Sequence, residues 1–228
     1  MLLFMELFHG SQNIIEFPEF GKGNPNNDYG LGFYCTESLE LAMEWACKLP
    51  RDGFANRYSL DASGLDVLDL MSDRYHVLNW LAVLLDNRVF EIGNPIAKDA
   101  KDYIISTYLP DYKERDIIRG YRADDSYFSF AKAFLNGAIP LVALSAALKL
   151  GKLGEQICLK SAVAIDRIHY LGAYVADGRQ YSMKRNIRDK RAREDYLKLL
   201  ESSAEDRNAV YMIDILRQQW PNEDERLR

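Results

Sequence analysis

The sequence predicts a chain of the α+β class, on three observations. Helix-like and strand-like segments are mixed along the chain, but the strands are too scattered for a regular βαβ series. Apolar residues make up 48% of the 228 residues and charged residues 28%, which is the balance of an ordinary globular protein. No internal repeat or low-complexity tract interrupts the pattern. Together these features favour one substantial packed core.

The N-terminal half is expected to carry most of the strands. The segments with strand character are residues 1–8, 33–35, 56–61 and 65–70. Apolar residues at helical spacing predict a helix that Thr36 or Ser38 caps and that reaches Leu49. Two further helices are expected at residues 73–88 and 97–108.

The C-terminal half is expected to be more helical. A strand at 116–120 precedes helical segments from 126 to about 150, interrupted near 137–140 by Gly137 and Pro140. A second strand is expected at 155–161, and charged helices at 182–202 and 205–220. We expect the last eight residues to fray. The predicted division is a domain over residues 1–178 with a charged helical extension, 179–228, packed on it.

Bulk properties limit the location and the partners of the protein. The net charge of −5 gives no global basic field for nucleic acid. Three widely spaced cysteines, Cys35, Cys47 and Cys158, fit reduced thiols in the cytoplasm. No segment approaches the roughly 20 apolar residues that a membrane-spanning helix needs.

Several common chemistries lack their motifs. Gly21-Lys22-Gly23 has neither the spacing nor the following Ser or Thr of a phosphate-binding loop, and no G-x-G-x-x-G opens a helix. The histidines His9, His76 and His169 lie far apart, and no Cys/His cluster has metal-ligand spacing, so we expect no metal.

Two segments have unusual chemistry. In Phe8-His9-Gly10-Ser11, a ring donor is followed by a glycine that lets a ligand approach the backbone; the alternative is a surface turn. In the second segment, Tyr34 lies eleven residues before Trp45, and a helix starting near Ser38 would fold the two rings toward one another. They would then sandwich a flat heteroaromatic ring. The alternative is that both are core aromatics.

Together these segments resemble the nicotinamide-binding motifs of the ADP-ribosyltransferase superfamily, in its His-Tyr-Glu branch. The resemblance implies a split β-sheet core with helical insertions, and NAD as a substrate. His9 would bind a ribose hydroxyl, Gly10 the carboxamide through its backbone, and Ser11 would be a further polar contact. Tyr34 and Trp45 would sandwich the nicotinamide; Trp45 stands where the family more often has Tyr.

The third motif of this branch is an acidic residue at the start of a late strand. The matching segment is Gly154-Glu155-Gln156-Ile157-Cys158-Leu159, and its register puts Gln156 at the catalytic position. Glu155 would face the other way in an ideal strand. A neutral Gln departs from the family pattern and supplies no charge to a developing cation, which argues against polymer elongation. The alternative is that Gln156 is an ordinary strand residue.

A narrower resemblance runs from about Leu3 to about Leu171. The order Leu-Phe-His-Gly-Ser, Asp-Tyr-Gly-Leu-Gly-Phe-Tyr-Cys-Thr and Ala-Met-Glu-Trp-Ala resembles a bacterial family described as domain of unknown function 3990. Its further landmarks are matched by residues 77–82, Arg88 and the segment from Asp116 to Asp125. The family's gene neighbourhoods imply a toxin or effector role with an antitoxin-like partner.

Three residues near the end of the 116–120 strand are candidates for the substrate side. Asp124 and Asp125, with Arg122 nearby on the substrate side, would orient substrate or accept a proton there; the alternative is that an aspartate caps the next helix. Residues 179–200 are strongly basic, which fits an acidic macromolecular partner or a solvated helix with local ion pairs.

The resemblance therefore implies an NAD-dependent mono-ADP-ribosyltransferase with an unidentified macromolecular acceptor, protein or nucleic acid. Two other hypotheses stay open. One is a catalytically inactive module of the same fold that binds NAD or a partner. The other is an interaction protein in which the aromatic residues are only core.

Overall fold

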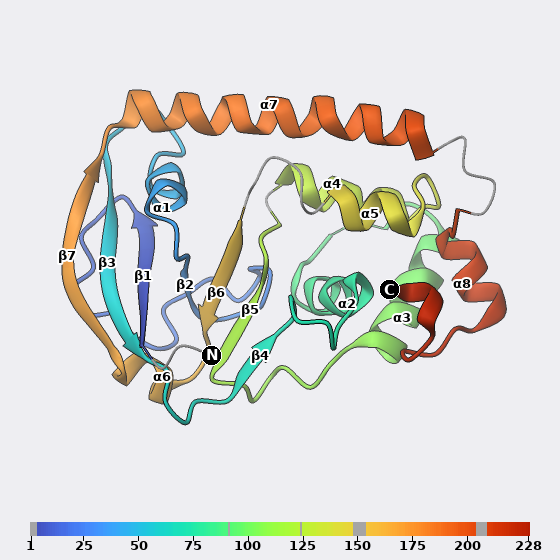
Figure 1. Cartoon of the computed structure of the whole chain (residues 1–228), viewed down its shortest axis with the longest axis horizontal. Coiled ribbons are helices and arrows are strands. Elements are labelled where there is room, and N and C mark those ends of the chain that lie inside the picture. Colours follow the sequence, from blue (N-terminus) through green and yellow to red (C-terminus); the bar gives the residue numbers. More distant parts are fainter. Residues whose placement is uncertain (1–3, 91, 124, 148–153, 204–208) are drawn as a thin grey trace.

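The computed structural model describes residues 4–90, 92–123, 125–147, 154–203 and 209–228, with side chains at 125–127 and 202–203 not described. In these residues the chain forms eight α-helices and two β-sheets (Figure 1). The predicted mixture of helices and strands is confirmed. No described helix combines the length and the apolar character needed to cross a membrane.

The first sheet has three antiparallel strands in the order β1-β3-β7. They are β1 (Phe4–Ser11), β3 (Gly53–Asp61) and β7 (Ile168–Ala176). Strand β1 extends past the expected end at Phe8, so His9 and Gly10 lie within it. The sequence analysis did not predict β7, nor the short helix α6 (Ala162–Asp166) before it.

The second sheet has four strands in the order β2-β6-β5-β4. They are β2 (Phe33–Cys35), β6 (Glu155–Leu159), β5 (Ile117–Tyr121) and β4 (Val67–Asp69). Strands β4 and β5 are parallel and the other pairs antiparallel. All four were expected: β2 has the predicted ends, and the ends of the other three differ from the prediction by at most two residues. The sheet sets Tyr34 opposite Cys158 and Gln156 opposite Gly120.

One backbone bridge joins the two sheets. The amide of Phe8 donates to the carbonyl of Thr36 over 2.8 Å, and the amide of Thr36 donates back over 2.9 Å. The residues on either side of this bridge therefore lie close together, although about 25 positions of chain separate His9 from Tyr34.

Helix α1 (Leu39–Ala46) packs on β1, and of the two expected caps, Thr36 and Ser38, it begins after Ser38. The hydroxyl of Ser38 accepts a hydrogen bond from the amide of Leu41, a standard N-cap arrangement. The helix ends at Ala46, earlier than the expected Leu49. Gly10 is required for this packing, because a Cβ there would overlap the backbone oxygen of Ala42.

Five further helices gather around the largest apolar core, beside β5 and β4 (Figure 1). They are α2 (Val77–Asn87), α3 (Pro95–Tyr108), α4 (Asp125–Leu135), α5 (Leu141–Ala147) and α8 (Met212–Gln218). Trp80 of α2 is fully buried there. Its indole nitrogen donates to the hydroxyl of Tyr29 and to the carbonyl of Tyr121, which fixes the loop before β2 against the end of β5.

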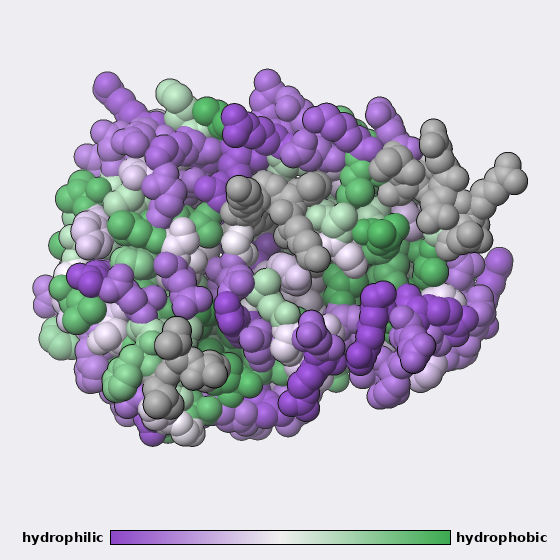
Figure 2. All heavy atoms as spheres, viewed as in Figure 1, coloured by the Kyte–Doolittle hydropathy of each residue, from purple (hydrophilic) through white to green (hydrophobic). Residues whose placement is uncertain are grey.

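Helix α7 (Gly178–Ser203) runs along one edge of the molecule, beside α1 at its start and beside α4 and α5 further on (Figure 1). Figure 2 shows this edge covered mainly by hydrophilic side chains. The predicted boundary at residue 178 coincides with the start of α7, and the division into two domains stays a prediction.

The end of the chain differs from the expectation of fraying. Residues 225–227 form a 3₁₀ helix in which Leu227 is buried, and the Arg226 guanidinium lies 3.7 Å from the centre of the Trp220 ring. Burial of Leu227 and stacking on Trp220 attach this segment to the helical core.

Candidate functional site

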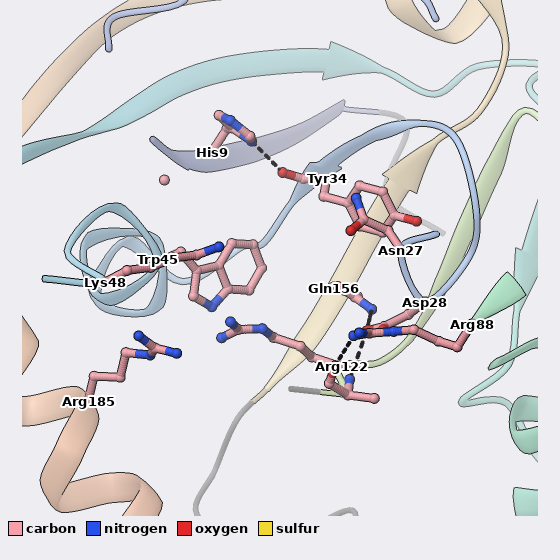
Figure 3. Close-up of a pocket in the computed structure, with 12 residues that line it drawn as sticks. His9, Asn27, Asp28, Tyr34, Trp45, Lys48, Arg88, Arg122, Gln156 and Arg185 are labelled. Atoms are coloured by element: carbon pink, nitrogen blue, oxygen red, sulfur yellow. Dashed lines mark hydrogen bonds and ion pairs between the residues drawn. The ribbon is translucent and has the colours of Figure 1, made fainter. Parts of the chain in front are cut away.

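A pocket of about 300 Å³ lies where the two sheets meet α1 and α7 (Figure 3). It brings together six of the residues that the sequence analysis singled out: His9, Gly10, Tyr34, Trp45, Arg122 and Gln156. The other residues that line it are Asn27, Asp28, Lys48, Arg88, Ala123 and Arg185. The size is at the lower end for small-molecule sites.

His9 is oriented by the neighbouring strand. Its Nδ1 lies 2.7 Å from the carbonyl oxygen of Tyr34, and its ring stacks on Phe33 with ring centres 4.4 Å apart. A carbonyl oxygen only accepts hydrogen bonds, so Nδ1 carries the proton and donates it. Burial lowers the pKa of His9 below its usual 6.5, which favours the neutral ring. Its Nε2 is then an acceptor.

The Tyr34 ring is held at its hydroxyl end. The hydroxyl donates to the carbonyl of Gly30 over 2.6 Å and accepts from the amide of Tyr29 over 3.0 Å. Gly30 makes this turn with a φ of +77°, a conformation that favours glycine. Burial raises the pKa of Tyr34, so the phenol stays neutral. Tyr34 therefore offers the pocket an uncharged aromatic surface and no general base.

Trp45 lies in the last turn of α1, on the far side of the pocket from Tyr34 in the view of Figure 3. The guanidinium of Arg122, just after β5, lies 4.7 Å from the centre of the indole ring. The indole nitrogen is buried and has no hydrogen-bond partner within the described part of the chain. A buried N–H without a partner is costly, so this donor would gain from an acceptor.

Gln156 faces the pocket from the start of β6 and is only 4% exposed. Its Nε2 donates to Oδ2 of Asp28 over 2.7 Å and lies 3.3 Å from the carbonyl of Tyr121. Both amide hydrogens thus have acceptors, and among the described residues Oε1 has no donor. The side chain offers the pocket an acceptor and no charge.

Asp28 is the centre of a buried polar network that the sequence analysis missed. Its Oδ1 accepts from Nε of Arg88 over 2.9 Å and from the terminal guanidinium nitrogen over 2.6 Å. Its Oδ2 accepts from the amide of Ala123 over 2.8 Å. The pairing of Asp28 with Arg88 joins residues 60 positions apart, which no local pattern reveals. Arg88 had been noted only as a family landmark.

Two predicted site residues lie outside the pocket lining. Glu155 points to the other face of β6, where its Oε2 accepts from Nε of Arg119 over 2.6 Å. The Ser11 hydroxyl donates to the carbonyl of Asn13 over 2.5 Å and accepts from Nδ2 of Asn56 over 3.0 Å. Strand alternation accounts for Glu155, because it neighbours Gln156 and adjacent side chains point to opposite faces of a sheet. Ser11 has the same parity as His9, and its two hydrogen bonds occupy its hydroxyl.

The remaining candidates give a partial picture. Asp124 and the side chain of Asp125 lie outside the described residues. Lys48 and Arg185 line the pocket although the sequence analysis gave them no role at it, and Arg185 comes from α7. Neither forms a side-chain hydrogen bond or ion pair with the described part of the chain. The described residues hold no group of three or more His, Cys, Asp or Glu side chains placed to bind a metal ion.

One comparison with known proteins found a match. A family model described as "Protein of unknown function (DUF3990)" matches residues 5–170, which is most of the chain and includes every pocket residue except Arg185. No curated protein and no solved structure matches the chain.

Proposed function

The chain belongs to the DUF3990 family, and we propose that it is an NAD-dependent mono-ADP-ribosyltransferase with the fold of that superfamily. It would transfer ADP-ribose from NAD to a macromolecular acceptor and release nicotinamide. The observation that carries the proposal is that five residues from three separate motifs, matched to nicotinamide-site positions by resemblance, line one pocket: His9, Gly10, Tyr34, Trp45 and Gln156.

The two aromatic rings fit a flat, cationic heteroaromatic group. Tyr34 is neutral and held at its hydroxyl, so its ring presents a face whose orientation does not depend on the ligand. Trp45 lies across the pocket from it (Figure 3). Stacking of a nicotinamide ring between them would contribute roughly 0.5–1.5 kcal/mol per aromatic pair beyond burial.

The polar groups fit the ribose attached to nicotinamide. Nε2 of neutral His9 and Oε1 of Gln156 are both acceptors, and ribose hydroxyls are donors. Two acceptors on one sugar would hold the anomeric carbon in a fixed position. The Gly10 backbone, which lines the same pocket, would receive the carboxamide.

In the proposed reaction the bond between the anomeric carbon and the nicotinamide nitrogen breaks, and its electron pair leaves with the neutral nicotinamide. The ribosyl cation is then attacked by a nucleophile of the acceptor, which loses its proton. Gln156 supports the cation through the dipole of its amide only. Because a full charge is often the largest catalytic contribution, we expect slow, single transfers, and hydrolysis when water attacks.

The setting that we propose is a cytoplasmic bacterial toxin or effector, with an antitoxin-like protein as its neutraliser. Expression in bacteria should slow growth, and His9→Ala should relieve the effect, because His9 would orient the ribose. Equal slowing by wild type and variant would separate any toxicity from this pocket.

The decisive experiment measures nicotinamide release from NAD by the purified full chain, with a cell lysate as acceptor. We compare the wild type with Tyr34→Ala and Tyr34→Phe, and use Tyr174→Ala, an exposed tyrosine of β7, as a matched control. Release by wild type, Tyr34→Phe and the control, with loss in Tyr34→Ala, would support the enzyme. Absence of release by the wild type contradicts it.

A second candidate is an inactive module of the same fold that binds NAD or a partner. The neutral Gln156, tied to Asp28, favours this alternative. Tight binding of intact NAD without nicotinamide release, weakened by Tyr34→Ala, would identify such a module.

A further inference from the structure

We propose that Arg185 of α7, together with Lys48 and Arg122, forms an anion site that binds the diphosphate of a nucleotide in this pocket. Naming NAD as that nucleotide rests on the proposed function, whereas the anion site itself does not. The site would make α7, which lies beyond the matched residues 5–170, part of the binding pocket.

The first observation is the charge of the pocket. Among the described residues that line it, Asp28 is the only carboxylate, and it is paired with Arg88. Lys48 and Arg185 have no side-chain partner among the described residues and bring positive charge to the pocket, where the guanidinium of Arg122 also lies, on a protein whose net charge is −5. The charge of Arg122 lies close enough to Glu44 to lower the pKa of that carboxyl, and the carboxylate is paired with Arg188. A concave surface with one sign of charge attracts an anion of the opposite sign.

The second observation is the origin of the three cations. Lys48 follows α1, Arg122 follows β5 and Arg185 projects from α7. Figure 3 shows Arg185 reaching from its helix toward Arg122 and Trp45. The like charges of Lys48 and Arg185 repel one another, and a multiply charged anion bound between them and Arg122 would remove that cost. Arginines also bind phosphate oxygens through two parallel hydrogen bonds.

The third observation is an unused donor. The buried indole nitrogen of Trp45 has no partner in the described part of the chain, and in Figure 3 it lies on the side of the ring that faces Arg122 and Arg185. A phosphate oxygen beside these guanidinium groups would accept its hydrogen bond.

Two ion pairs fix the position of Arg185. Lys184 pairs with Glu40 and Arg188 with Glu44, and both glutamates belong to α1. Residues 184 and 188 are one helical turn apart, so these contacts set the rotation of α7 and hold the intervening Arg185 toward the pocket. The helix that carries the basic segment is thereby anchored to the helix that carries Trp45.

The test is calorimetric binding of four ligands to the full chain. NAD, ADP-ribose and ADP contain the diphosphate, and nicotinamide riboside lacks it. We compare the wild type with Arg185→Gln and with Arg191→Gln, an exposed arginine of the same helix that does not line the pocket. Arg185→Lys serves if Arg185→Gln does not fold.

We expect Arg185→Gln to lower the affinity for the three diphosphate ligands on the order of 10- to 100-fold, and the affinity for nicotinamide riboside less than about twofold. The wild type should also lose affinity for ADP more steeply with added salt than the variant does. Arg191→Gln should match the wild type. Equal binding by Arg185→Gln and wild type, an equal loss for nicotinamide riboside, or no binding of ADP at all would overturn the proposal.

Failure of the anion site and failure of the proposed transferase activity give different results. If ADP binds in an Arg185-dependent manner but no nicotinamide is released from NAD, the anion site stands and the transferase fails. If NAD is cleaved and Arg185→Gln binds it normally, the transferase stands and the anion site fails.

Discussion

Nε2 of Gln156 donates to Oδ2 of Asp28 across 2.7 Å, in a buried part of the pocket wall. Asp28 in turn is paired with Arg88, so the amide is held by a carboxylate whose charge is already compensated. The Gln is therefore adapted to its partner. A Glu at the same position would meet the carboxylate of Asp28 directly.

The first prediction concerns Gln156→Glu. Placing a second carboxylate beside Asp28 creates like-charge repulsion in a buried site, so we expect a lower free energy of unfolding at pH 7, by about 1–3 kcal/mol. Nicotinamide release should not rise, although the His-Tyr-Glu branch of ADP-ribosyltransferases, which the motifs resemble, has an acid here. Denaturant unfolding and the release assay measure both effects.

The matched control for this prediction is the double variant Asp28→Asn with Gln156→Glu, which exchanges the donor and the acceptor. It should recover much of the lost stability, because the amide introduced by Asp28→Asn can donate to the new carboxylate. A stable Gln156→Glu single variant with faster release would show that the network does not exclude an acid.

The second prediction concerns the ion pair of Asp28 and Arg88. The aspartate side chain is 5% exposed, so Arg88→Met leaves a buried charge without its cation and should cost about 3 kcal/mol of stability. Asp28→Asn should be destabilising as well. The double variant should lose less than the sum of the two, with a coupling of about 1–3 kcal/mol in a double-mutant cycle. Additive losses would mean that the pair contributes little.

The sequence predicted those elements that have strong local signals. The apolar spacing of α2, the Ser38 cap of α1 and the short strand β2 are all read from neighbouring residues. Strand β7 was missed because most of it is half-buried or exposed and it pairs on one side only. Gly172, with φ +140°, lies at a shift of register against β3 and breaks the alternation further.

The pocket was predicted only where motifs carried it. His9, Tyr34, Trp45 and Gln156 belong to segments with recognisable spacing, and all four line the pocket. The sequence could not identify Asp28 as a site residue, because its role depends on hydrogen-bond partners as far along the chain as Gln156. Arg185 is one of several basic residues in 179–200, and only the rotation of α7 distinguishes it from the rest.

The third prediction concerns pH. Burial lowers the pKa of His9 and of His76 below the usual 6.5, so the folded protein binds these protons less readily than the unfolded chain does. Their contribution to stability is therefore complete above about pH 6.5 and is lost as the pH falls from there through the lowered values. His9→Gln should remove part of this dependence, and His76→Gln another part.

Thermal unfolding between about pH 5 and pH 8 measures the loss of stability for the wild type, each single variant and the double variant. NMR titration of the imidazoles assigns the two contributions. In the proposed complex His9 accepts a hydrogen bond from a ribose hydroxyl of NAD. Adding NAD should therefore lower the pKa of His9 further and leave that of His76 unchanged. An increase in the pKa of His9 on adding NAD would contradict the proposed acceptor role of Nε2.

The fourth prediction separates packing from binding at Gly10. A Cβ there would overlap the carbonyl oxygen of Ala42 and approach Cβ of Trp45 to 2.8 Å, so α1 must move away from β1. We expect Gly10→Ala to cost about 2 kcal/mol or more and to weaken NAD binding, because Trp45 moves with its helix. Gly93→Ala is the control: a Cβ there meets no atom of the described residues within 4 Å, and the change should stay within about 0.5 kcal/mol. If Gly10→Ala were as stable as the wild type yet failed to bind NAD, the glycine would serve the ligand and not the contact between strand and helix.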